Sequence, residues 1–329
     1  MSLEPLQKTI LVTGGAGYIG SHVSHLLVEQ GYRIVVVDSL EKGRKEFLPP
    51  QATFYHIDLS DSKALKDVFE KEDISCVMHF AGYSEVAEST RLPEKYFAGN
   101  VANTLILLDT MRAAGVQRFI FSSSAAVYGV PSKVPIEEDH PKRPMNPYGV
   151  SKSMVEEILQ SYHDAHGMRF VSLRYFNAAG ADESGVRGEA HEPETHLIPL
   201  ILDAAMGRRE AITIFGDDYE TKDGTCIRDY VHVNDIAHAH VLAMKAIDQL
   251  KQSCINLGTA SGMSVKEIIS MCEEVTGVAI PTAMGARRAG DPPILVADFK
   301  RAQVLLGWTP QRDIRQIVQS AWEWHKKLK

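Results

Sequence analysis

Cysteine, basic charge and long apolar runs are all scarce in this chain of 329 residues. Its four cysteines, Cys76, Cys226, Cys254 and Cys272, show neither CxxC nor metal-ligand spacing. We therefore expect reduced, buried thiols, which suit the cytoplasm. No apolar stretch approaches the length of a membrane span, and the N-terminus lacks the apolar core of a signal peptide. The sequence predicts a cytoplasmic protein without a membrane partner.

The charge pattern also excludes some functions. The net charge is −7 and no basic cluster stands out, so nothing favours a nucleic-acid partner. The histidines show no ligand spacing that calls for a metal, so we expect no metal site. A hydrophobic content of 44% and a charged content of 23% are typical of a globular protein. The length allows one large domain or two ordinary ones.

Residues 9–38 carry the most informative pattern, a strand, a glycine turn, a helix and a second strand. Gly14, Gly17 and Gly20 have the spacing GxxGxxG, a variant of the dinucleotide-binding fingerprint. The first glycine permits a tight turn, the second lets backbone N–H groups approach a pyrophosphate, and the third lets the helix pack against the strand. The phosphates would lie at the positive end of the helix dipole.

Asp38 follows the second strand, where a carboxylate can accept both ribose hydroxyls of an adenosine. The same carboxylate repels a 2′-phosphate, so the sequence predicts NAD rather than NADP. Three glycines alone could also serve an ordinary turn between a strand and a helix. The order of strand, turn, helix, strand and terminal Asp38 favours the cofactor site.

Strands and helices alternate from residue 9 to about residue 176, which predicts an α/β fold with a doubly wound parallel sheet of the NAD-binding Rossmann type. Right-handed crossovers place the carboxyl ends of all strands at one edge, where such folds bind ligands. The residues expected at this edge are Gly14, Asp38, Asp58, Gly82 and Ser122–Ser124.

Beyond residue 177 the loops lengthen and the alternation becomes irregular. We predict two domains, a nucleotide-binding domain over 1–176 and a smaller α/β substrate lobe over 177–329. The segment 233–260 again resembles a helix followed by a strand, so we expect part of it to rejoin the first domain.

A candidate catalytic group follows the strand at 116–122. Ser124 lies just beyond this strand, Tyr148 opens the next helix, and Lys152 lies one helical turn further on the same face. A free tyrosine titrates near pH ~10. A nearby ammonium group and a positive nicotinamide ring both favour the phenolate, so we expect a lowered pKa for Tyr148.

This group suits removal of a proton from an alcohol while NAD takes its hydride. YxxxK by itself is common, and a tyrosine at a helix start often only packs. The serine run could equally be a plain strand end. Their position after a dinucleotide fingerprint favours alcohol–carbonyl redox chemistry.

Several stretches together resemble the extended short-chain dehydrogenase/reductase family over nearly the whole chain. They are VTGGAGYIGSH (12–22), HFAG (79–82), FIFSSSAAVYG (119–129), NPYGVSK (146–152), LRYFNAAGA (173–181), HLIPLI (196–201), IFGDDYETKDGTCIRDYVHV (214–233) and RRAGD (287–291). Of these, TKDGTCIRDYVHV and RRAGD are the most particular, and they are similar to the members that invert C4 of UDP-hexoses.

The resemblance implies an isomerase that interconverts UDP-glucose and UDP-galactose with tightly bound NAD. Tyr148 would deprotonate the C4 hydroxyl, Ser124 would hydrogen-bond it, and the hydride would return to the opposite face of the 4-keto sugar. It also implies a homodimer formed through the helices near 93–114 and 148–166.

The resemblance further implies which residues contact each ligand. Those at the cofactor are Gly14, Gly17, Tyr18, Ile19, Gly20, Asp38, Ser39, Leu40, Gly43, Asp58, Leu59, Phe80, Ala81, Gly82, Ser84, Gly99, Ser122, Ser124, Tyr148, Lys152, Tyr175 and Phe176. Those at the substrate are Ser124, Tyr148, Asn177, His196, Leu197, Phe215, Arg228, Arg288, Asp291 and Leu295.

Alternatives remain open for some of these residues. Arg228 could instead pair with Asp229, and Phe215 could belong to a core. Ser84, Gly99 and His196 replace a lysine and two asparagines that are frequent in the family. Leu295 is intermediate in size, so N-acetylated UDP-hexoses could also be substrates.

Other activities of the same fold require other residues. A 4,6-dehydratase needs carboxylates beside Ser124, where this chain has Ala125 and Ala126. An epimerase of UDP-pentoses or UDP-uronates is possible on residues alone. A catalytically silent NAD-binding regulator would lack the Tyr148–Lys152 pair, which is intact here.

Overall fold

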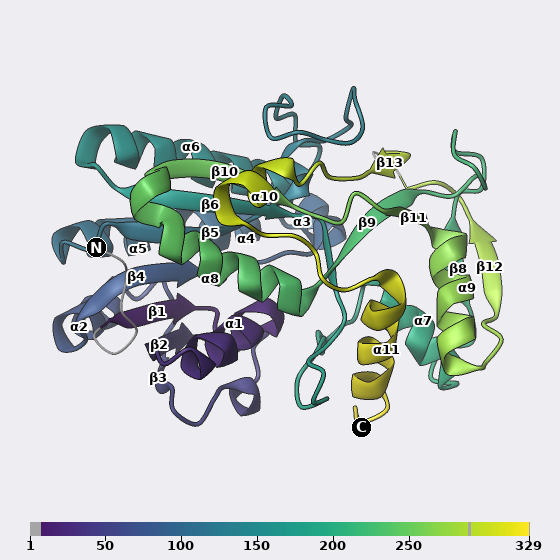
Figure 1. The fold of residues 1–329 in the computed structure, drawn as a ribbon, viewed down its shortest axis with the longest axis horizontal. Coiled ribbons are helices and arrows are strands. Elements are labelled where there is room, and N and C mark those ends of the chain that lie inside the picture. The colour runs from purple at the N-terminus through teal and green to yellow at the C-terminus, as the bar shows by residue number, and fades with distance from the viewer. Residues whose placement is uncertain (1–7, 289–290, 329) are drawn as a thin grey trace.

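The structure is a computed structural model that describes residues 8–288 and 291–328. Figure 1 shows a large sheet between helices, beside a smaller lobe that carries the C-terminus. Among the described helices, none is long and apolar enough to cross a bilayer.

Seven parallel strands form the large sheet in the order β10-β6-β5-β4-β1-β2-β3. They are β1 (Thr9–Thr13), β2 (Arg33–Asp38), β3 (Thr53–His56), β4 (Ile74–His79), β5 (Arg118–Ser124), β6 (Arg169–Tyr175) and β10 (Gln252–Leu257). The central strands are covered on both faces, which explains their continuous apolar sequences. The predicted doubly wound α/β fold is confirmed.

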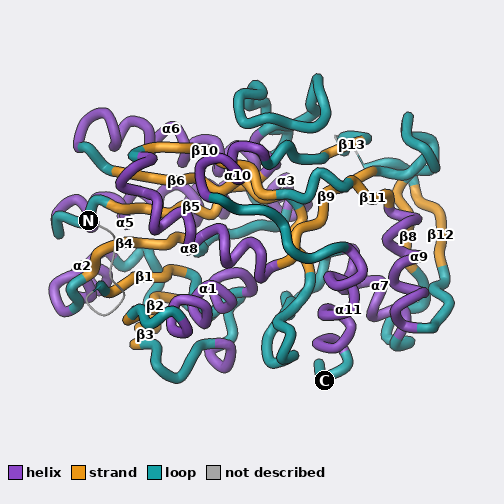
Figure 2. Tube along the Cα trace, viewed as in Figure 1, coloured by secondary structure: helices purple, strands orange, loops and turns teal. Residues whose placement is uncertain are grey.

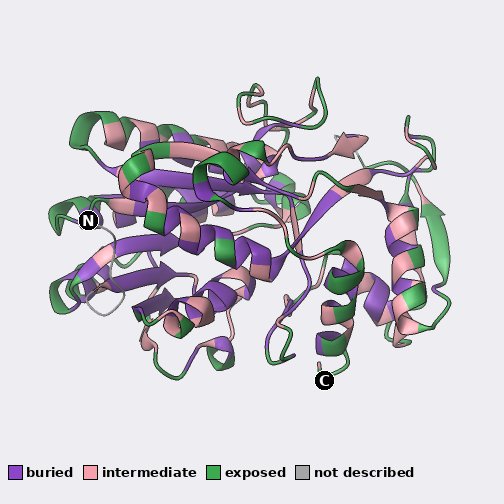
Figure 3. Cartoon of the chain, viewed as in Figure 1, coloured by how far each residue is buried: buried purple, intermediate pink, exposed green. Residues whose placement is uncertain are grey.

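Successive side chains of each strand enter two different cores. In β1, Ile10 and Val12 pack in the core under one set of helices, whereas Leu11 packs in the opposite core. The first core is covered by α1 (Tyr18–Glu29), α8 (Val233–Leu250) and α10 (Lys300–Leu306), and the second by α2 (Ser62–Lys71), α5 (Asn103–Ala113) and α6 (Pro147–His166). Figure 3 shows how completely the strands between them are buried.

The helix expected as one piece near 93–114 has three parts. These are α4 (Pro93–Tyr96), the π-helical segment η3 (Phe97–Ala102) and α5, while α3 (Val86–Arg91) precedes them. At Gly99 a Cβ would lie 2.5 Å from the Tyr83 ring. Asn100 accepts a hydrogen bond from the Tyr83 N–H (2.7 Å) and donates to Ser151 Oγ (3.0 Å). The π-helical turn of η3 is wider than an α-helical turn, and it brings Asn100 inward beside α6.

The smaller lobe is built around β9 (Ile227–His232), whose neighbours are short strands (Figure 2). Its elements are β7 (Asn177–Ala179), α7 (Leu197–Ala205), β8 (Ile212–Phe215), β11 (Gly262–Ser264), α9 (Val265–Thr276), β12 (Thr282–Gly285), β13 (Ile294–Leu295) and α11 (Ile314–His325). α7, α9 and α11 share a third apolar core.

The chain returns to the large sheet after β9. α8 packs against α1 and β6, and β10 pairs with β6 along its whole length. The division at residue 176 stays a prediction. The helix–strand segment 233–257 packs with the first part of the chain across it, and α10 does so as well.

Candidate functional site

A cavity of about 1160 Å³ lies at the carboxyl edge of the large sheet and extends to the smaller lobe. Its walls include, from the predicted ligand contacts, Gly14, Gly17, Tyr18, Ile19, Gly20, Asp38, Ser39, Gly43, Asp58, Leu59, Phe80, Ala81, Gly82, Ser84, Gly99, Ser122, Ser124, Tyr148, Lys152, Tyr175, Phe176, Asn177, His196, Leu197, Phe215, Arg228, Arg288, Asp291 and Leu295. Leu40 is the exception. It acts through its backbone, whose N–H donates to Asp38 Oδ1 (2.8 Å).

The glycine turn leaves no room for side chains. Gly14 has φ +70°, and a Cβ there would lie 2.4 Å from the Ala81 nitrogen. A Cβ on Gly20 would lie 2.2 Å from the Gly14 oxygen. α1 starts at Tyr18 after Gly17, which has no side chain to cap the helix, so its first N–H groups remain open to an anion. The turn fits the pyrophosphate of a dinucleotide.

Asp38 is fixed at the end of β2. Its carboxylate accepts hydrogen bonds from the N–H groups of Ala16 (2.9 Å) and Leu40 (2.8 Å). Burial raises the pKa of Asp38, and these N–H groups oppose that rise. A Cβ on Gly43 would meet Asp38 Oδ1 at 2.9 Å, so the ribose-side wall is also tightly packed.

Tyr148 and Lys152 lie on the first turns of α6. Asn146 caps this helix by accepting the Gly149 N–H (2.8 Å). Lys152 Nζ donates to the Ser122 carbonyl (2.8 Å) and lies 5.9 Å from the centre of the Tyr148 ring. The sequence predicts that the Lys152 ammonium group reaches toward the Tyr148 hydroxyl. In the structure the ammonium group lies over the face of the Tyr148 ring, at the end of β5.

Burial governs the proton affinities of this pair. It raises the pKa of Tyr148, while a hydrogen bond with Ser124 lowers it. Burial also lowers the pKa of Lys152 to about 8, while the Glu156 carboxylate raises it. In the chain without cofactor, burial therefore keeps the pKa of Tyr148 above its usual value. The lowered pKa expected beside a bound nicotinamide ring stays a prediction.

A buried ion pair between Glu156 of α6 and Arg174 of β6 holds the helix on the sheet. Arg174 donates twice to Glu156 (2.8 and 2.7 Å), which also accepts from Ser123 Oγ (2.7 Å). Arg174 further donates to the Tyr128 hydroxyl (2.9 Å). Because both charges are fully paired, this network fixes α6 against β5 and β6.

The smaller lobe supplies the opposite end of the cavity. Arg228 forms an ion pair with Asp291 and donates to the Ile227 carbonyl (2.8 Å). The alternative pairing of Arg228 with Asp229 is wrong, since Asp229 is buried and accepts from Thr259 (2.6 Å). The core alternative for Phe215 is also wrong.

Phe215 is 38% exposed, and the Arg288 guanidinium lies 4.1 Å from the centre of its ring. An aromatic face beside a cation suits a planar base next to a phosphate.

One group on the cavity wall escaped the sequence analysis. Glu189, His191 and His196 each place one potential ligand atom within 4.8 Å of the others. The expectation that no histidine spacing calls for a metal did not foresee this group, and the absence of a metal site stays a prediction. The signal was present as ExHxxxxH, but it lies in a long loop without regular structure. The carboxylates of Glu189 and Glu194 raise the pKa of His196 to about 9.

Comparisons with known proteins agree with this site. The NAD dependent epimerase/dehydratase family matches residues 10–258. A "UDP-glucose 4-epimerase" of Halalkalibacterium halodurans is 48% identical over 97% of this chain and 96% of its own length, and one of Streptococcus mutans is 51% identical over 96% of each. A crystal structure of UDP-glucose 4-epimerase from Brucella ovis in complex with NAD matches with a TM-score of 0.93 and 47% identity, over 96% of this chain and 97% of that one.

The buried Lys152 makes stability depend on pH. Its pKa falls from 10.5 to about 8 on folding, so the charged form is disfavoured in the folded chain. The penalty is complete below pH ~8 and vanishes as pH rises through 10.5, because the unfolded state binds more protons in that window. We expect nucleotide-free Lys152→Met to exceed the wild type in stability by roughly 3 kcal/mol at pH 7.

This difference should shrink toward zero by about pH 10.5 in urea unfolding of both proteins. Lys66→Met, at an exposed position, should show no such trend. A pH-independent difference for Lys152→Met would contradict the assignment.

Proposed function

Because this chain belongs to the NAD dependent epimerase/dehydratase family, we infer that it is an NAD-dependent UDP-glucose 4-epimerase. As an isomerase of this kind, it interconverts UDP-glucose and UDP-galactose. The observation that carries this conclusion is the single cavity that joins the Gly14 turn, Tyr148 and the Arg288–Phe215 wall.

The first half of the chain holds the cofactor. When bound, NAD supplies reversible hydride acceptance, so the sugar is oxidised and reduced again within one turnover. The open N–H groups at the start of α1 receive the pyrophosphate, and Asp38 accepts the ribose hydroxyls. Both features are rigid, which suits a cofactor that stays bound between turnovers.

The proton is handled at Tyr148. Its phenol oxygen accepts the proton of the C4 hydroxyl, and Ser124 hydrogen-bonds the same oxygen of the sugar. Because burial raises the pKa of Tyr148, the base depends on the positive charge of Lys152 and of the oxidised cofactor. Inversion requires the 4-keto sugar to turn over in the cavity, so that C4 is reduced from its opposite face while Tyr148 returns the proton to the C4 oxygen.

The smaller lobe anchors the UDP. Arg228 and Arg288 can donate to the diphosphate, and Asp291 can accept a ribose hydroxyl. Phe215 offers a face to the uracil. His196, Asn177, Leu197 and Leu295 border the remaining space. Firm binding of UDP leaves the hexose free to rotate.

We also propose a cytoplasmic homodimer. All four cysteines are free thiols, and three of them are buried, as a reducing compartment permits. The segment η3 and helix α6 pack side by side, and they expose Phe97 (36%) and Met154 (42%). An apolar pair on adjacent helices suits a symmetric interface.

Replacing Tyr148 by Phe tests the base. The purified wild type should convert UDP-galactose to UDP-glucose without added NAD. Tyr148→Phe should retain bound NAD but lose at least about 100-fold in rate, because the general base is gone. Tyr162 lies in the same helix and its hydroxyl donates a hydrogen bond to Asp109, so Tyr162→Phe should keep the wild-type rate. Near-normal turnover by Tyr148→Phe would refute the assigned base.

Replacing Asp38 by Ala tests the ribose site. We expect this variant to lose most of its bound NAD, measured in the supernatant after denaturation, since the two ribose hydroxyls lose their acceptor. The exposed Asp67→Ala on α2 is the matched control and should retain NAD. Equal occupancy in both variants would discredit the role of Asp38.

Replacing Met154 by Glu tests the dimer. A charge in the centre of an apolar interface is costly, so sedimentation should report a dimer for the wild type and a monomer for Met154→Glu. Val304→Glu, at an 80% exposed position of α10, should remain dimeric. A monomeric wild type would overturn the proposal.

A further inference from the structure

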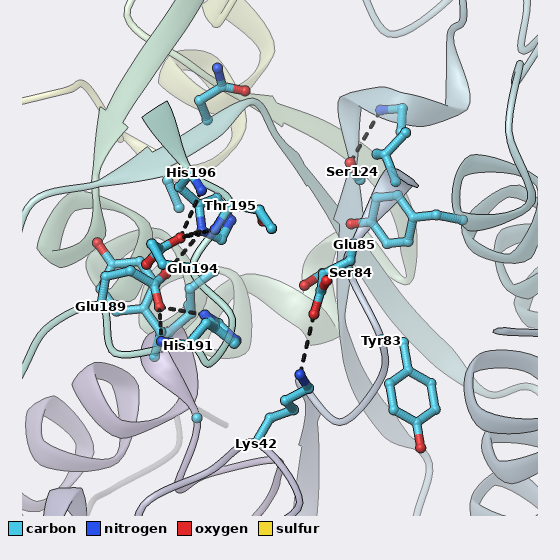
Figure 4. A pocket seen from close by; sticks show the side chains of 18 of the residues that line it. Lys42, Tyr83, Ser84, Glu85, Ser124, Glu189, His191, Glu194, Thr195 and His196 are labelled. Atoms are coloured by element: carbon cyan, nitrogen blue, oxygen red, sulfur yellow. Dashed lines mark hydrogen bonds and ion pairs between the residues drawn. The ribbon is translucent and has the colours of Figure 1, made fainter. Parts of the chain in front are cut away.

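The group Glu189, His191 and His196 lies on the cavity wall and has no part in the proposed reaction beyond the position of His196. Figure 4 shows these side chains converging on one side of the cavity, opposite Ser84, Glu85 and Ser124. They come from the loop that precedes α7. Glu189 is buried, while His196 is nearly half exposed toward the cavity.

The distances suit coordination of one ion. His196 Nδ1 lies 3.6 Å from Glu189 Oε2, and His191 Nδ1 contacts Glu189 Oε1. Two ligands of a tetrahedral ion with bonds of ~2.0 Å lie ~3.3 Å apart. Small adjustments of the side chains would therefore place all three atoms around a common centre.

We propose that Glu189, His191 and His196 bind a divalent transition-metal ion of the zinc type. Two imidazoles and one carboxylate form a ligand set that zinc accepts in three protein positions, with a fourth left for another oxygen. All three residues line the cavity, so a phosphate or hydroxyl oxygen of a bound ligand could supply the fourth ligand. The site goes beyond the epimerase reaction and does not require it.

Charge favours a dication at this place. Glu194 also contacts the group, since its Oε1 lies 2.8 Å from His196 Nδ1. Two carboxylates therefore meet two imidazoles, with Glu189 the buried member. A dication would balance both carboxylates and displace any proton from the imidazole nitrogens that coordinate it. Mg²⁺ is excluded by its preference for oxygen ligands and octahedral geometry.

The loop is held in place from both halves of the chain. Trp324 Nε1 of α11 donates to the Glu189 carbonyl (2.8 Å), and Arg44 donates to the Ala190 carbonyl (3.3 Å). Glu189 Oε1 also accepts the N–H groups of Ala190 (2.8 Å) and His191 (3.0 Å). Such outer contacts orient ligands before the ion arrives.

The experiment is calorimetric titration of ZnCl₂ into tag-free protein that retains NAD and has been freed of metals by chelation. We expect one Zn²⁺ per chain, unaffected by ~100-fold excess of Mg²⁺. Glu189→Gln keeps the shape of the side chain, and His191→Ala removes one imidazole. Each should weaken binding at least about 10-fold. His166→Ala, exposed at the end of α6, should bind as the wild type does.

Co²⁺ provides a second readout. Wild-type protein should show the visible absorption of four-coordinate Co²⁺, which Glu189→Gln and His191→Ala should lose while keeping the wild-type circular dichroism. The absence of stoichiometric Zn²⁺ binding, or equal affinity in both variants and the wild type, would overturn the metal site. Either result would leave the epimerase assignment untouched, because no turnover is measured.

Discussion

The contact between the β1–α1 turn and the end of β4 is the constraint on which the cofactor cavity depends. With 2.4 Å between a hypothetical Gly14 Cβ and the Ala81 nitrogen, the backbones touch without side chains. This closeness lets α1 begin directly at the cavity floor. The same crowding holds Gly43 against Asp38, so the Asp38 end of the cavity is packed as closely as the glycine turn.

Burial shifts the pKa values of Tyr148 and Lys152 in directions that oppose proton removal by Tyr148. The phenol of Tyr148 is harder to ionise than in water, and Lys152 is easier to deprotonate. Neither group alone makes a base. In the proposed mechanism, a positive nicotinamide ring beside Tyr148 favours the phenolate, which would couple proton removal to an oxidised cofactor. Such coupling would keep a chain without NAD from deprotonating the sugar.

Much of this could be predicted from the sequence. The glycine turn and Asp38 depend on local spacing, and the alternation of strands and helices defines a parallel sheet. Contacts between distant residues were harder to foresee. Arg228 pairs with Asp291 instead of its neighbour Asp229, because alternation along β9 points adjacent side chains to opposite faces. The Glu189–His196 group was missed because its loop has no periodicity, and contacts with distant residues such as Trp324 and Arg44 help to hold that loop.

The return of β10 to the large sheet has a consequence during synthesis. When the ribosome has released the chain as far as β6 but not yet α8 and β10, β6 is an open edge, and the apolar face beneath α8 has no cover. The nucleotide-binding unit can close only after residue 257 has emerged, and α10 completes its core later still. A nascent chain of this protein therefore exposes apolar surface until α8, β10 and α10 have emerged, and exposed apolar surface with an unpaired strand edge is what makes partly folded chains prone to aggregate.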